Sequence, residues 1–175
     1  EVGFSLYTEL LNRAVESLKA GRAPDFDKPV NAATDINLHT PALLPGSYVE
    51  DVHLRLVLYK RIAAAHSREE LEELEAEIVD RFGPAPTPTR VLFDLTTVKL
   101  RTTALGITRI EAGPKGARVE FSETPNVDPA HIIKLLQTES RRYRLDGPNR
   151  LRITVELPDA AARLAAIATL IDGLR

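Results

Sequence analysis

One stretch of the chain, SREELEELEAEIVDRFG from Ser67 to Gly83, carries the signals for both ends of an amphipathic helix. Ser67 and Glu70 have the spacing of a capping box, in which two side chains satisfy free N–H groups of the first turn. Gly83, followed directly by a proline, is typical of a helix stop. The segment therefore predicts a helix with one buried face. The apolar residues that recur at helical spacing on that face are Leu71, Leu74, Ile78 and Phe82.

The opposite face of this helix is acidic. Like charges three or four residues apart are unfavourable in a helix, by about 0.2–0.5 kcal/mol for each pair. Asp80 also lies in the last turn, where the helix dipole disfavours a negative charge by about 0.3–1 kcal/mol. Within the segment, Arg81 offers local relief to Glu77. Such violations are expected where function outweighs stability, although a charged run is more often a solvated face without a partner. The acidic residues are Glu69, Glu73, Glu77 and Asp80.

Composition limits the class of protein. The 175 residues are 43% hydrophobic but only 5% aromatic, which predicts one domain of ordinary size with an aliphatic core. The absence of cysteine excludes disulfides and fits a reducing compartment. A net charge of −2 and a pI of about 6.1 give no global indication of nucleic-acid binding. No apolar run approaches the roughly 20 residues of a membrane span. Because the chain contains no methionine, we expect it to be a piece of a longer protein.

The pattern of apolar residues divides the chain into three parts. We expect a separate N-terminal helix within residues 1–22, a proline-containing linker over 23–33, and a compact domain over 34–175. The domain is expected to be α+β: a helical layer and a small, mostly antiparallel sheet with helices packed on one face. In the helix expected at 49–65, the inward residues are predicted to be Val52, Leu56, Tyr59 and Ile62. Strands are expected at 34–40, 107–112, 117–121, 143–145 and 151–155, and further helices from the prolines at 84–88 to about 105, from 128, and over 157–174.

Catalytic and metal-binding patterns are absent from the sequence. The four histidines show no ligand spacing, and no cysteine supplements them, so we expect no metal site and no cofactor. Gly113-Pro114-Lys115-Gly116 superficially resembles a phosphate-binding loop, but it lies between two predicted strands and is better explained as a hairpin turn. An active site is therefore not expected in this chain, and only a cluster of histidine and carboxylate side chains would restore that hypothesis. The histidines are His39, His53, His66 and His131.

A basic zone surrounds one predicted hairpin. Its positive charges and its tyrosine suggest contacts with a phosphate backbone and stacking on a base. The alternative is a strand with solvated arginines on one side that pair internally with the acidic helix. The low pI argues against nucleic-acid binding, because the usual footprint is a strongly basic face. The residues of this zone are Arg141, Arg142, Tyr143 and Arg144.

Four segments in a fixed order resemble the C-terminal domain of bacterial transcription-repair coupling factors. They are PALLPGSYVEDVHLRLVLYKRIA (41–63), EIVDRFG (77–83), LGITRIEAG (105–113) and RYRLDGP (142–148). The resemblance covers residues 34 to the end. The first residues, EVGFSLYTELLNRAVESLKAG, resemble the end of the translocase module of the same family, within a motif shared with the RecG helicase. The resemblance implies that residues 1–22 end the motor, 23–33 form a linker, and 34–175 form a regulatory domain.

The resemblance also implies a function. Full-length members of this family are bacterial, cytoplasmic, ATP-driven translocases on double-stranded DNA that act on stalled RNA polymerase and recruit the excision-repair protein UvrA. Their ATP site lies outside the part matched here, so a non-catalytic role is expected. In the family the terminal domain folds back on the N-terminal UvrB-like module, masks the UvrA surface and restrains the motor. Carried onto this sequence, the implied docking residues are Glu77, Asp80 and Arg81.

Overall fold

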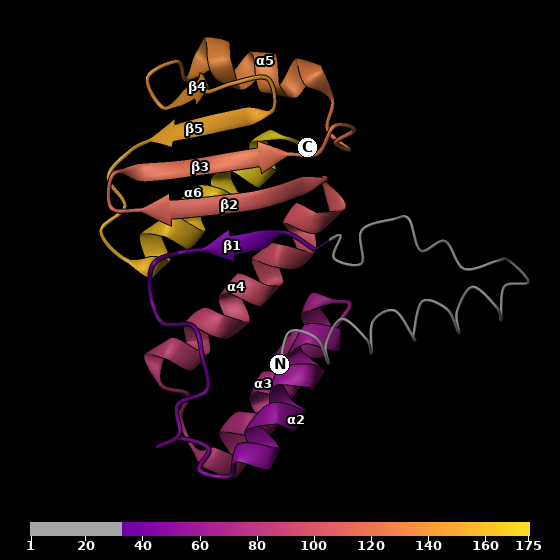
Figure 1. Cartoon of the computed structure of the whole chain (residues 1–175), viewed down its shortest axis with the longest axis vertical. Helices are drawn as coiled ribbons and strands as arrows, with labels where there is room; N and C mark the ends of the chain where they lie inside the picture. Colours follow the sequence, from indigo (N-terminus) through magenta and orange to yellow (C-terminus); the bar gives the residue numbers. More distant parts are fainter. Residues whose placement is uncertain (1–32) are drawn as a thin grey trace, which may run out of the picture. The chain divides into compact units, whose positions relative to one another are not determined.

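The computed structural model describes residues 33–175, so the predicted N-terminal helix and most of the linker lie outside the described residues. The described part is α+β, as the sequence predicted, and combines a sheet with five helices among residues 33–175 (Figure 1). The elements in chain order are β1 (Asp35–Asn37), α2 (Val52–Ala64), α3 (Arg68–Phe82), α4 (Thr87–Ala104), β2 (Ile107–Gly113), β3 (Gly116–Phe121), α5 (Pro129–Thr138), β4 (Tyr143–Leu145), β5 (Arg150–Thr154) and α6 (Ala160–Gly173).

The sheet has five strands in the order β1-β2-β3-β5-β4. Strand β1 pairs with β2 in parallel, and the three other pairings are antiparallel. The parallel pair requires a crossover, and the chain supplies it with α2, α3 and α4. Side chains alternate between the two faces, so one face is apolar and the other is charged. Helix α6 lies behind the sheet in Figure 1, against the apolar face, and its residues Ile167, Leu170 and Ile171 are fully buried.

Two hydrophobic clusters form the core, and α4 contributes to both. The first lies between the sheet and the helices α4, α5 and α6, and includes Ile110, Val119 and Leu151. The second lies within the helical layer of α2, α3 and α4. Along α4, Val98 belongs to the first cluster and Phe93 to the second. This helix therefore fixes the position of the α2–α3 hairpin relative to the sheet.

Helix α3 begins and ends where its capping signals predicted. The Ser67 hydroxyl accepts a hydrogen bond from the Glu70 backbone N–H at 3.2 Å, and the Glu70 carboxylate accepts one from the His66 N–H at 2.8 Å. Gly83 follows the last helical residue with a φ of 90°, a conformation that favours glycine. The hydroxyl of Tyr48 donates to the Gly83 carbonyl at 2.6 Å. Both ends of α3 are thus held by specific bonds, and its exposed face has a defined orientation.

The predicted inward face of α2 was wrong at two of its four residues, whereas Tyr59 packs against the second cluster as predicted. Val52 and Leu56 are 61% and 46% exposed, whereas Leu58 is 1% exposed and fills the second cluster. Ile62 is buried as predicted. Apolar residues occupy most positions around this helix, so its periodicity does not select one face. Packing of the helical hairpin against Phe93 of α4 selects it instead.

Candidate functional site

The acidic face of α3 is exposed, but one of its carboxylates is already paired. Arg61 of α2 donates from Nη1 and Nη2 to the two carboxylate oxygens of Glu77, at 2.8 Å and 2.7 Å. The hydrogen bond from Arg61 lowers the pKa of Glu77. The sequence indicated relief for Glu77 only from within its own helix. Arg61 is sixteen residues away on another helix, so helical spacing alone could not identify it.

Asp80 and Arg81 lie one turn further along α3 and are both exposed. Asp80 makes no hydrogen bond or ion pair within residues 33–175. The Arg81 guanidinium lies 5.2 Å from the centre of the Phe82 ring, which fixes its stem against the end of the helix. The structure therefore brings the three predicted docking residues onto one surface. On this surface the Asp80 carboxylate is unpaired, the Arg81 guanidinium packs on the Phe82 ring, and the Glu77 carboxylate is bonded to Arg61 of α2.

A second carboxylate of α3, Glu75, faces the opposite way, toward α4. Partial burial raises the pKa of Glu75, and the neighbouring carboxylate of Asp94 on α4 raises it further, against the effect of Arg90. Burial also raises the pKa of Asp94. Glu75 and Glu77 are two residues apart, yet their pKa values move in opposite directions. The difference arises because Glu77 has gained a hydrogen-bonded cation, whereas Glu75 has lost solvent beside another acid.

This contrast predicts opposite effects of two matched substitutions on thermal stability. A raised folded-state pKa means that the folded chain binds more protons than the unfolded chain, so stability falls as pH rises through that pKa. Glu75→Gln should therefore raise Tm at pH 7. A lowered folded-state pKa contributes stability above the unfolded value and loses it on acidification, so Glu77→Gln should lower Tm at pH 7. Both changes should shrink toward pH 3.5 in circular-dichroism melts, and equal shifts at the two pH values would contradict this explanation.

The basic hairpin differs from its sequence-based interpretation in one residue. Tyr143 is 1% exposed and belongs to the first cluster, so its ring offers no open face to a base. The Arg142 guanidinium lies 5.6 Å from the centre of that ring. Burial raises the pKa of the Tyr143 hydroxyl, and the Arg142 charge opposes the rise. Arg141 and Arg144 are exposed. Arg141 and Arg144 remain available to an anion, but base stacking on Tyr143 has no structural support.

The alternative interpretation, internal pairing of the basic hairpin with the acidic helix, has no ion pair to support it within residues 33–175. The carboxylate of Asp146 instead pairs with Arg152 of this hairpin at 3.1 Å and with Arg118 of β3 at 3.5 Å. The balancing charge therefore comes from the turn between β4 and β5 rather than from α3. The exposed acids of α3 receive no cation from the sheet in the described structure.

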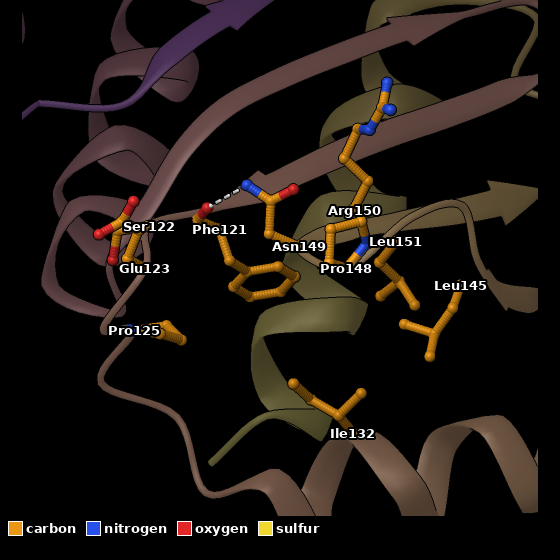
Figure 2. A pocket seen from close by; sticks show the side chains of 10 residues that line it. All are labelled: Phe121, Ser122, Glu123, Pro125, Ile132, Leu145, Pro148, Asn149, Arg150 and Leu151. Carbon is orange, nitrogen blue, oxygen red and sulfur yellow. Dashed lines mark hydrogen bonds between the residues drawn. The ribbon is translucent and has the colours of Figure 1, made fainter.

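A cleft of 490 Å³ opens between α5 and the end of the sheet (Figure 2). Its floor is apolar, with Ile132 of α5 facing Leu145 and Leu151 of the β4–β5 hairpin. The Asn149 side chain donates to the Phe121 carbonyl at 3.1 Å, which ties the hairpin to β3. Arg150 extends away from this floor (Figure 2). The charged side chains that line the cleft come from different segments, Glu123 from the loop after β3 and Arg150 from the start of β5.

No metal site was expected from the four histidines. Within residues 33–175, histidine, aspartate and glutamate side chains do not gather in a group of three that could hold a metal ion. His39 contacts Glu111 at 3.1 Å, and the Nδ1 atom of His131 lies 3.1 Å from the carbonyl oxygen of Leu174. In the same part of the chain, no helix combines the length and apolar character needed to cross a bilayer.

Residues 33–175 form a small α+β domain in which α3 presents an exposed, charged surface. A solved structure described as the crystal structure of the C-terminal domain of transcription-repair coupling factor has the same fold. The TM-score is 0.67 with 22% sequence identity, and the match covers 83% of this chain and 95% of the solved one. At this identity the likeness establishes the fold alone.

The sequence comparisons establish the family. The TRCF domain family model matches residues 38–132. The chain is 44% identical to the transcription-repair-coupling factor of Escherichia coli (strain K12) over 163 residues, and 44% identical to that of Haemophilus influenzae over 170 residues. The matches cover 93% and 97% of this chain. The chain therefore belongs to the transcription-repair coupling factor family. It spans only 14% and 15% of the length of these two relatives, so it corresponds to one part of a much longer protein.

Proposed function

We propose that residues 34–175 form a non-catalytic autoinhibitory domain that docks on the N-terminal UvrB-like module of the same protein. Residues 1–22 then end the translocase module, and 23–33 link it to the domain. The observation that carries the proposal is the end of α3, where Asp80 has no partner within residues 33–175 and lies beside the exposed Arg81. A carboxylate at the negative end of a helix dipole is unfavourable unless an external cation faces it.

The proposed mechanism is competition between an internal contact and external partners. While the domain is docked, the UvrA surface is covered and the ATP-driven motor on double-stranded DNA is restrained. Engagement of RNA polymerase would release the domain. A contact of this kind needs a differential free energy of only a few kcal/mol to keep the open form minor. Because the contact is exposed and charged, high salt should weaken it.

The experiment that tests the proposal is charge reversal at Asp80 in the full-length protein. Asp80→Arg should raise UvrA affinity and DNA-stimulated ATPase activity, each by roughly tenfold, because like charges brought together across an interface cost several kcal/mol. UvrA affinity is measured by titration and ATPase activity by steady-state assay. Asp80 is a better site for this test than Glu77, whose reversal would also break the bond with Arg61 inside the domain.

The matched control is Glu73→Arg. Glu73 lies on the same exposed face of α3, about two turns before Asp80, and makes no ion pair within residues 33–175. Glu73→Arg changes the net charge by the same amount but lies outside the proposed contact. UvrA affinity and ATPase activity should therefore stay within about twofold of the parent protein. Unchanged values for Asp80→Arg, or equal increases for the two variants, would refute docking through the end of α3.

A further inference from the structure

The outer face of the sheet carries two parallel rows of side chains, and the rows differ in charge pattern. Strand pairing places Asp35, Arg109, Glu120 and Arg150 in one row, where opposite charges alternate from strand to strand. The other row runs through all five strands. In order from β1 to β4 it consists of Asn37, Glu111, Arg118, Arg152 and Arg144. We call the last three residues of this second row the arginine row.

The arginine row breaks a rule of sheet stability that its neighbour obeys. Like charges directly opposite each other on adjacent strands are destabilising. Yet Arg118 faces Arg152, and Arg152 faces Arg144. Within residues 33–175, Asp146 is the acid that pairs with them, at 3.5 Å from Arg118 and 3.1 Å from Arg152. The Glu111 carboxylate, although opposite Arg118, contacts His39 and Arg109 instead.

All three guanidinium groups are open to an external partner. The side chains of Arg118 and Arg152 are 45% and 50% exposed, and Arg144 is exposed without an ion pair in the described part of the chain. None of the described helices covers this face of the sheet, because α6 lies on the other side (Figure 1). Three guanidinium groups and one carboxylate leave an excess of two positive charges, which attracts anions from outside the domain.

We propose that the arginine row binds an acidic helix of a protein partner, laid across strands β3, β5 and β4. Side chains facing each other across strands have Cβ atoms about 4.5–5.5 Å apart. Carboxylates at i, i+4 and i+7 on one face of a helix have a spacing of about 5–6 Å. One carboxylate can therefore meet each arginine, and the planar guanidinium suits bidentate bonding to a carboxylate.

Nucleic acid fits this surface less well than an acidic helix. Single-stranded binding normally needs exposed aromatic rings for base stacking, and Tyr143 beside the row is buried. The pI of about 6.1 is far from the basic value typical of domains that bind duplex DNA. The proposal does not rest on docking through α3, since the arginine row lies on a different element of the fold.

The test uses the complete 175-residue chain and a labelled helical peptide with glutamates at i, i+4 and i+7 along one face. A peptide of the same composition with its glutamates spread around the helix serves as the probe control. In fluorescence anisotropy at about 50 mM salt, where charge interactions are weakly screened, the first peptide should bind at least tenfold more tightly than the second. Amide shifts in β3, β4 and β5 should locate it.

Two double variants separate the row from the general charge of the face. R144Q/R152Q and R109Q/R150Q each remove two positive charges from the outer face. The first should weaken peptide binding at least tenfold, and the second by no more than about twofold. Tm should not fall in R144Q/R152Q, because the opposed like charges are relieved. Asp80→Arg should leave peptide binding unchanged, so this test is independent of the proposed autoinhibitory contact.

Three results would overturn the proposal. The first is failure of the parent chain to distinguish the two peptides. The second is equal weakening by the two double variants, which would reduce the effect to the overall charge of the face. The third is tighter binding of a 20-base-pair DNA duplex than of the peptide at equal salt, lost in R144Q/R152Q, which would make the arginine row a phosphate-binding surface.

Discussion

Replacing Gly116 by alanine should lower the free energy of unfolding by about 3 kcal/mol or more. Gly116 opens β3 at a φ of 145°, a conformation that costs other residues about 1–3 kcal/mol. A Cβ atom there would lie 2.0 Å from the carbonyl oxygen of Ile153 on β5. That oxygen belongs to the backbone of a paired strand, so relief requires the strands to move apart. Thermal unfolding followed by circular dichroism should show Tm lower by roughly 10 °C.

Gly113 provides the matched control within the same hairpin. It pairs with Gly116 across the turn, but a Cβ atom at Gly113 would meet no heavy atom within 4 Å. Gly113→Ala should therefore change the free energy of unfolding by less than about 0.5 kcal/mol. Equal losses of unfolding free energy for the two substitutions would show that both glycines serve the flexibility of the turn. Such a result would contradict the close approach of β5 as the reason why Gly116→Ala is destabilising.

The turn containing these glycines shows what local sequence signals can specify. The order of apolar residues and the Gly-Pro-Lys-Gly segment predicted a hairpin, and the structure confirms it between β2 and β3. Ser67 predicted a helix start in the same way, and a helix was expected from Asp128; both side chains accept backbone hydrogen bonds at these starts. These features depend on interactions between residues close in the chain, so the sequence pattern is sufficient to predict them.

Features that depend on distant residues were not predictable in the same way. The parallel pairing of β1 with β2 joins segments about seventy residues apart, and the sequence gives no sign of its direction. The bond from Arg61 to Glu77 joins two helices, and it changes which acidic residue of α3 is available for docking. The burial of Tyr143 arises from the packing of β4 in the sheet, although its arginine neighbours suggested an exposed position.

The candidate docking surface is thus narrower than the acidic pattern suggested. The sequence already set Asp80 apart, because it opposes the helix dipole, but kept Glu77 beside it as a docking residue relieved only by Arg81. The structure assigns Glu77 a bond within the domain and leaves Asp80, of the two carboxylates at the end of α3, without a partner within residues 33–175. Substitution of Asp80 therefore tests the proposed docking contact without breaking a bond inside residues 33–175, which makes Asp80 the most informative position on this surface.

Replacing Arg163 by methionine should lower the free energy of unfolding by about 3 kcal/mol. Arg163 on α6 is 5% exposed, an unusual position for arginine, which is almost always solvated unless paired. Its Nε donates to the Leu157 carbonyl at 3.0 Å and its Nη1 to the Leu38 carbonyl at 2.8 Å. Hydrogen bonds from charged donors contribute roughly 1.5–3 kcal/mol each. Methionine keeps the apolar stem but leaves two carbonyl groups without this donor.

The bonds of Arg163 connect the segment after β1 to the start of α6. Their loss should therefore destabilise this region locally, in addition to lowering the stability of the whole domain. Amide hydrogen exchange around Leu38 should accelerate in Arg163→Met before the domain as a whole unfolds. Arg68→Met is the control, because Arg68 is exposed and pairs only with Glu72 on its own helix, and it should leave Tm nearly unchanged. Lysine at position 163 should not restore stability, because one ammonium group cannot reproduce the planar fork that reaches both carbonyls. A parent-like Tm for Arg163→Met would mean that water replaces the lost donors, and that the buried arginine does not hold β1 against α6.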